Sequence, residues 1–161
     1  MTALEVWWCD EHHRTPHLIT TFSQVDALID VLREVEGHRR VAARLALHRS
    51  VRPYTEHGVP DHELIVGVDP AEDVGSLRLT TYDTVWYAQG KPCDDDQPIS
   101  YRLLCRRQDF PPDSLTALGD IRAAVKDFLI NSGCRRPVDL HSTRWPAAEP
   151  PRLERGRGRW P

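Results

Sequence analysis

A chain of 161 residues is long enough to form one domain around a single hydrophobic core, without help from a metal or from disulfides. An apolar content of 40% and a charged content of 28% are ordinary for a globular protein and exclude a wholly disordered chain. The net charge of −3 is uneven: residues 146–161 carry four arginines against two glutamates, a net of +2, so residues 1–145 carry −5. An acidic body argues against direct nucleic-acid binding and favours a partner with a basic surface.

The sequence also predicts where the protein works. There is no apolar run of membrane-spanning length and no export signal, so we expect a cytoplasmic protein without a membrane contact. In a reducing compartment, widely spaced cysteines are free thiols rather than a disulfide framework. The cysteines are Cys9, Cys93, Cys105 and Cys134.

The first quarter of the chain predicts a strand, a polar segment and a helix. Residues 4–8 are apolar and aromatic and suit a strand, whereas residues 9–17 are polar and suit a loop. Ser23 has the side chain of a helix N-cap, and Gly37 is a typical helix stop. Between them, apolar residues recur at helical spacing, at Val25, Leu28, Ile29, Leu32 and Val35.

The middle of the chain predicts strands joined by loops. Residues 41–47 alternate, with Val41, Ala43, Leu45 and Leu47 facing a core and the others facing partly into water. Residues 64–68 are apolar throughout, as in a strand covered on both faces. Two further strands, 77–81 and 85–87, are joined by a short turn and should be antiparallel. Residues 90–98, with two prolines and three aspartates, predict a surface loop.

The C-terminal part predicts one more strand, the main helix and a last strand. Ile99, Tyr101, Leu103 and Cys105 share one face of a strand. Pro111 and Pro112 stop it, and Asp113 or Ser114 could cap the helix that follows. The predicted buried stripe of this helix is Leu118, Ile121, Val125, Phe128 and Leu129, while Arg122, Lys126 and Asp127 face water. Gly133 ends the helix, and residues 138–145 return as a strand.

These elements predict a single α+β domain over residues 1–145, with a mainly antiparallel sheet of six or seven strands and two helices packed on one face. Residues 146–161 form a tail rich in Pro, Arg and Gly. They have too few apolar side chains to offset the entropy cost of ordering, so we expect disorder.

One cluster holds side chains that could bind a metal: Cys9, His12, His13 and His17. Their spacing does not match the paired ligands of structural zinc sites, which favours an ordinary polar loop. The serine-hydrolase elbow, the zinc-protease helix motif and the phosphate-binding loop are all missing from the sequence. We therefore expect no cofactor and no catalysis. The alternative is a small metal- or thiol-dependent enzyme that uses this cluster or Cys134.

A second set of residues suggests a binding surface. Asp94, Asp95 and Asp96, with Asp83 on the preceding turn, are either a solvated loop or an imitation of the phosphate backbone that a nucleic-acid enzyme grips. Trp86 and Tyr87 point to opposite faces of their strand, so one belongs to the core and the other is available as an aromatic contact. The Arg-rich tail offers a third possibility, an RNA contact.

The order of parts from Leu77 to Trp145 resembles a known family. The similarity is carried by Trp86-Tyr87 on a strand, Phe110-Pro111-Pro112 before the helix, Ala124, Phe128 and Leu129 within it, and Arg136-Pro137 leading to Trp145. This layout resembles the first immunity-protein family of bacterial polymorphic toxin systems, often encoded beside deaminase toxins.

The resemblance implies a protein that binds and neutralises a cognate toxin, a nucleic-acid deaminase, by occluding its active-site cleft without chemistry of its own. The surface residues that we predict to contact the toxin are Asp83, Trp86, Tyr87, Asp94, Asp95, Asp96 and Trp145.

Overall fold

A computed structural model describes residues 2–35, 37, 39–50, 54–81, 84–91, 94–131 and 140–141. Over these ranges the chain forms two α-helices, one short 3-10 helix and ten strands that join in one sheet. The helices are η1 (Asp10–His13), α1 (Phe22–Arg33) and α2 (Leu118–Ile130). The strands are β1 (Leu4–Trp7), β2 (His17–Ile19), β3 (Val41–Leu47), β4 (Glu63–Asp69), β5 (Val74–Thr80), β6 (Val85–Ala88), β7 (Ile99–Leu103), β8 (Arg106–Phe110), β9 (Thr116–Ala117) and β10 (Leu140–His141).

The predicted α+β class is confirmed, with one correction to the strand count. Strands β2, β8 and β9 were not predicted, so the described sheet has ten strands rather than six or seven. Only the β10 part of the predicted strand 138–145 lies within the described residues. None of the described helices is long and apolar enough to cross a membrane.

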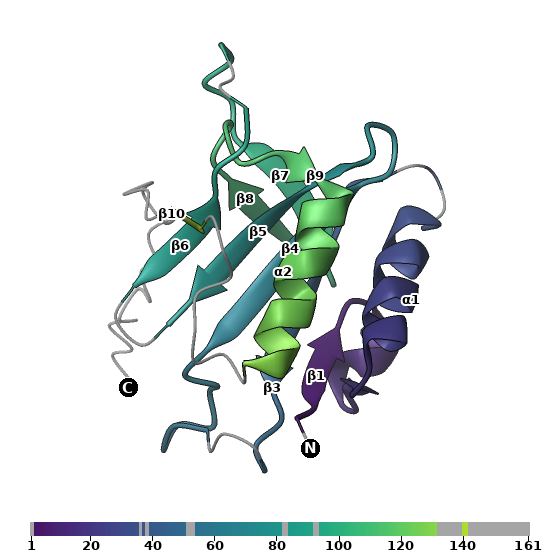
Figure 1. The fold of residues 1–161 in the computed structure, drawn as a ribbon, viewed down its shortest axis with the longest axis vertical. Coiled ribbons are helices and arrows are strands. Elements are labelled where there is room, and N and C mark those ends of the chain that lie inside the picture. The colour runs from purple at the N-terminus through teal and green to yellow at the C-terminus, as the bar shows by residue number, and fades with distance from the viewer. Residues whose placement is uncertain are drawn as a thin grey trace, which may run out of the picture.

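The sheet is built mainly from antiparallel neighbours. Its strand order is β10-β6-β5-β4-β3-β1-β2, and every adjacent pair on this path is antiparallel. Strands β7 and β8 form a hairpin outside the path, and β7 meets the start of β3 through one parallel contact, Val41 with Arg102. In Figure 1 the two helices lie in front of the sheet and the β7–β8 hairpin lies behind it.

The core on the helix side follows the predicted apolar stripes. All five residues of the α2 stripe are buried, and so are Val25, Leu28, Ile29 and Leu32 of α1. They pack on side chains of β1, β3, β4 and β5 to form one continuous cluster. The prediction of two helices on one face of the sheet is therefore confirmed.

The contact between the two helices corrects a prediction of solvent exposure. Arg122 and Lys126 of α2 are half-buried and face α1 instead of water. Arg122 donates hydrogen bonds to Asp30 and to the backbone oxygen of Asp26, the latter at 2.8 Å, and Lys126 Nζ lies 2.8 Å from Asp26 Oδ2. Helical periodicity in one helix cannot show that a second helix with acidic side chains lies alongside it.

The two helix caps also differ from those predicted. Thr21, not Ser23, caps α1: its Oγ1 accepts from the backbone N of Gln24 at 3.3 Å, and Gln24 Oε1 accepts from the backbone N of Thr21 at 3.1 Å. This reciprocal capping box is stronger than a single serine cap. Helix α2 begins at Leu118, and its N-cap residue, Ala117, has no side chain that can cap it; Ser114 is buried and contacts Ser76 instead.

The second face of the sheet is covered by the β7–β8 hairpin. Its side chains form a separate cluster of Ala42, Ile65, Tyr87, Ile99, Tyr101, Leu103 and Phe110. Ala42, predicted to face water, is therefore fully buried. The Tyr101 ring lies so close to Gly67 that a Cβ at this position would be 2.7 Å from ring atoms, which restricts the site to glycine.

A buried hydroxyl chain ties this hairpin to the sheet and predicts a loss of stability at high pH. Tyr101 Oη lies 2.9 Å from Ser76 Oγ, which lies 3.0 Å from Ser114 Oγ. Burial raises the pKa of Tyr101 from 10.0 to about 12. The unfolded chain thus releases the Tyr101 proton near pH 10, while the folded chain keeps it until about pH 12. The contribution of this group to the free energy of unfolding is therefore complete below pH 10 and is lost as the pH rises towards 12.

We expect the free energy of unfolding to fall by about 1–3 kcal/mol through this titration. Urea unfolding at a series of pH values from neutral to alkaline measures the slope. The Tyr101→Phe variant is the control, because it has no proton to lose there. Equal slopes in the two proteins would show that Tyr101 does not carry the effect.

Candidate functional site

The structure places Trp86 and Tyr87 on opposite faces of β6, as predicted. Tyr87 is buried in the hairpin-side cluster, with its ring 6.1 Å from that of Phe110 in a T-shaped arrangement. Trp86 is half-buried and packs against the helix-side core. Tyr87 is therefore a core residue, and Trp86 offers only part of its surface to a partner.

The three consecutive aspartates lie in the connection between β6 and β7, which projects from one end of the sheet (Figure 1). We call Asp94, Asp95 and Asp96 the acidic loop. All three are exposed. The backbone N of Gln97 donates to Asp95 Oδ1 at 3.0 Å, and no ion pair joins these carboxylates to a cation in the described part of the chain.

Other predicted residues cannot be placed. Asp83, Trp145, Cys93, Cys134 and the tail 146–161 lie outside the described residues. Their contribution to binding stays a prediction.

In the N-terminal cluster, three rings lie close together: the half-buried rings of Trp8 and His12 and the exposed ring of His17. The His12 ring lies 4.0 Å from the Trp8 ring and 6.0 Å from the His17 ring, measured between centroids. Cys9 Sγ lies 3.0 Å from His12 Nδ1. The prediction of a polar loop over residues 9–17 is corrected in part, because residues 10–13 form η1 and residues 17–19 form β2 along β1.

The electrostatics of this cluster disfavour a thiolate–imidazolium pair. Burial lowers the pKa of His12, and the neighbouring His17 lowers it further, against a smaller raising effect of Glu11. At neutral pH the His12 ring is therefore uncharged and cannot stabilise a Cys9 thiolate by its charge. His13 lies in η1, and its side chain is outside the described residues. Within the described part of the chain, no group of three or more His, Cys, Asp or Glu side chains is arranged to hold a metal ion.

Cys105 does not lie on an inward strand face, which corrects a prediction. The strand ends at Leu103, and Leu104 and Cys105 form the two-residue turn of the β7–β8 hairpin, where Cys105 is exposed. Leu104 has a φ of 53°, in the left-handed region that glycine or asparagine usually occupies in such turns. A leucine there gives no turn signal in the sequence, so this hairpin was missed.

The hairpin gathers basic side chains that sequence reasoning did not connect. We call the exposed residues Arg39, Arg40, Arg102, Arg106 and Arg107 the arginine platform. With Ser100, Tyr101 and Cys105 they line an open depression of about 550 Å³. The only signal for it in the sequence was the density of arginines near residues 39–40 and 102–107, which the fold brings together through β3 and β7.

Carboxylates neutralise only part of the arginine platform. Arg40 Nε lies 2.6 Å from Asp69 Oδ2, and Arg107 Nε lies 2.6 Å from Asp109 Oδ1. Arg102 Nε donates to the backbone oxygen of Leu104 at 3.0 Å. The guanidinium groups of Arg39 and Arg106 have neither a hydrogen-bond partner nor an ion-pair partner among the described residues.

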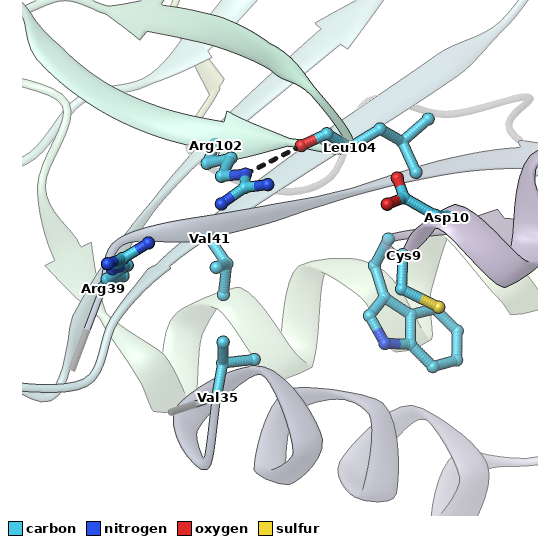
Figure 2. Close-up of a pocket in the computed structure, with 8 residues that line it drawn as sticks. Cys9, Asp10, Val35, Arg39, Val41, Arg102 and Leu104 are labelled. Atoms are coloured by element: carbon cyan, nitrogen blue, oxygen red, sulfur yellow. Dashed lines mark hydrogen bonds between the residues drawn. The ribbon is translucent and has the colours of Figure 1, made fainter. Parts of the chain in front are cut away.

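A smaller pocket adjoins the arginine platform (Figure 2). This hairpin pocket, of about 310 Å³, is lined by Trp8, Cys9, Asp10, Val35, Arg39, Val41, Arg102 and Leu104. In Figure 2, Arg39 lies to the left of Val41 and Arg102 lies above it, whereas Cys9 and Asp10 lie to the right. The pocket therefore combines apolar walls with two arginines that it shares with the platform.

The described surface therefore carries two features of opposite charge, an acidic loop at one end of the sheet and a basic, partly apolar surface at the hairpin turn. Comparison with known families identifies the class of protein. The sequence model of the immunity protein Imm1 matches residues 13–144, and the chain belongs to this family. No curated protein matches the chain.

Membership in this family identifies the general function of the protein and the kind of partner that it binds. The protein has the toxin-neutralising role of an immunity protein, and its partner is a cognate toxin. The matched range includes both α-helices, the acidic loop and the β7–β8 hairpin, but begins after Cys9 and His12. Two members of the Cys/His cluster are thus outside the matched range, whereas Cys134, the other residue of the enzymatic alternative, is inside it.

Proposed function

We propose that this immunity protein works in the cytoplasm and neutralises a nucleic-acid deaminase by placing its acidic loop in the enzyme's active-site cleft. The observation that supports the mechanism is the exposure of three adjacent carboxylates without a cation partner in the described part of the chain. The deaminase identity is supported by the resemblance that runs from Leu77 to Trp145.

The chemistry of the target explains why an acidic loop suits it. A deaminase must admit an unstacked base to a zinc-activated water, and it holds the flanking phosphates with basic side chains. Three consecutive carboxylates present negative charge to the same Lys and Arg side chains, and charge-assisted hydrogen bonds to such groups are stronger than neutral ones. Occupation of the cleft excludes the substrate without any reaction.

The base of this connection is fixed to the rest of the fold. The backbone N of Gly90 donates to the backbone oxygen of Asp113 at 2.6 Å. A Cβ on Gly90 would lie 1.7 Å from the backbone oxygen of Leu115, so only glycine fits. A fixed base lowers the entropy cost of ordering the loop in a complex.

The experiment uses the cognate toxin, which we expect to be encoded beside this gene. We expect the purified toxin to convert cytosine to uracil or adenine to inosine in single-stranded DNA or RNA, and this protein to abolish that conversion at an equimolar amount. Inhibition should be competitive with the nucleic acid, because both occupy one cleft. If the toxin alone has no deaminase activity although this protein neutralises it, the deaminase assignment is wrong. If the inhibition is noncompetitive, the cleft-occlusion mechanism is wrong.

A further inference from the structure

We propose that the arginine platform and the hairpin pocket form a second docking surface, which binds an acidic segment of the cognate toxin that carries an apolar side chain. The proposal rests on the toxin-neutralising function. It holds whether or not the toxin is a deaminase, and whether or not the acidic loop enters its cleft.

The first argument is uncompensated positive charge. Arg107 is paired with Asp109. Arg102, directly opposite Arg107 in the β7–β8 ladder, donates to the backbone oxygen of Leu104 and has no carboxylate partner among the described residues. Arg39 and Arg106 add two more exposed guanidinium groups without a carboxylate partner among the described residues. A surface that concentrates positive charge in this way is suited to an anionic partner.

The second argument is backbone strain at the same place. Leu104 holds a φ of 53°, a conformation that costs a bulky residue free energy and that glycine adopts freely. Its side chain is half-buried, packs against the hairpin-side cluster and also lines the hairpin pocket. An apolar side chain at a position that favours glycine indicates a use for that side chain, here both in packing and as a wall of the pocket.

The third argument is rigidity. The backbone N of Arg102 donates to the backbone oxygen of Arg40 at 3.0 Å, which joins the hairpin to the segment that carries Arg39 and Arg40. The Arg40–Asp69 pair has its carboxylate almost fully buried and holds this segment to β4. The two halves of the platform are therefore fixed relative to each other, as an interface requires.

A protein partner fits this surface better than nucleic acid does. Single-stranded nucleic acid is usually bound by stacking on exposed aromatic rings. The large exposed apolar residues in the described part of the chain lie elsewhere and are Leu18, Phe22, Val31, Val59 and Ile130. An apolar pocket next to arginines instead matches an aliphatic or aromatic side chain flanked by carboxylates.

The test measures the affinity of full-length variants for the toxin encoded beside this gene. In Arg106→Glu we expect the Kd to rise by about tenfold or more at about 0.15 M salt, and the ratio to wild type to shrink at higher salt. The matched control is Arg49→Glu, which makes the same charge change at an exposed residue beyond the opposite end of β3. It should bind within about twofold of wild type.

A second variant tests the pocket. Leu104→Gly keeps the turn, since glycine accepts this φ, and removes the apolar wall. We expect its Kd for the toxin to rise by about fivefold or more. Wild-type affinity in either Arg106→Glu or Leu104→Gly would overturn the proposal. So would binding of a short single-stranded oligonucleotide by the isolated protein that is lost in Arg106→Glu.

The failure of this proposal can be told apart from failure of the acidic-loop mechanism. A variant with Asp94, Asp95 and Asp96 all replaced by Asn is measured in parallel. Weak binding by that variant together with wild-type binding by Arg106→Glu refutes only the platform. The reverse result refutes only the acidic loop.

Discussion

Phe128→Ala should lower the free energy of unfolding by about 3–5 kcal/mol, because it removes a fully buried aromatic ring and leaves a cavity. Phe128 lies in the α2 stripe, in the cluster that joins both helices to the sheet. That loss is a large share of the 5–15 kcal/mol that stabilises a typical domain. Thermal unfolding followed by circular dichroism should show a midpoint lowered by roughly 10 °C or more.

The matched control is Ile130→Ala on the same helix. Ile130 is 60% exposed, so its truncation should change stability by no more than about 0.5 kcal/mol. Equal melting temperatures for Phe128→Ala and wild type would show that this face of α2 is not in the core.

Replacement of Asp94, Asp95 and Asp96 by Asn should weaken toxin binding by about 2–5 kcal/mol if the three carboxylates are paired in the complex. The fold should be unaffected, because the described residues give these side chains no ion pair and only one backbone hydrogen bond. Calorimetric titration with the toxin measures the difference. It should shrink with rising salt, which screens the charges that remain exposed.

Three exposed carboxylates on other connections provide the control, Glu11, Glu34 and Glu56. Their joint replacement by Gln removes the same net charge from η1, the end of α1 and the β3–β4 connection. We expect binding close to that of wild type. If both triple variants lose the same affinity, net charge rather than the acidic loop attracts the toxin.

The parts of the fold that the sequence predicted are those whose signal is contained in one element. The stripe of α2 repeats at helical spacing, and all five of its residues are buried. The apolar run 64–68 predicted a strand covered on both faces, and β4 is covered by the helices on one side and by the hairpin on the other. Both patterns can be read locally, because an element buried on one face or on both carries apolar residues at the matching spacing whichever segment covers it.

The errors arose where a distant segment or an unusual backbone conformation decides the structure. The β7–β8 hairpin turns at Leu104, without the glycine or asparagine that would mark it, so two strands were interpreted as one and Cys105 was placed in the core. Because β8 was missed, Ala42 was predicted to face water. The ion pairs of Arg122 similarly depend on α1, about a hundred residues earlier.

The same limit applies to the candidate site. The acidic loop is continuous in sequence and could be recognised there, whereas Arg39 and Arg106 are brought together only by the pairing of β7 with β3. The family resemblance could likewise be recognised from the sequence, because it depended on motifs within single elements. It identified the immunity function that the Imm1 match supports.

The central claim, that this protein neutralises a toxin by binding it, is tested most directly by survival. Bacteria that carry an inducible copy of the toxin encoded beside this gene are given either this protein or an empty vector. We expect growth only with the protein, and a stable complex of the two chains on gel filtration of the lysate. Death of cells that contain soluble, folded protein, with no complex formed, would contradict the claim.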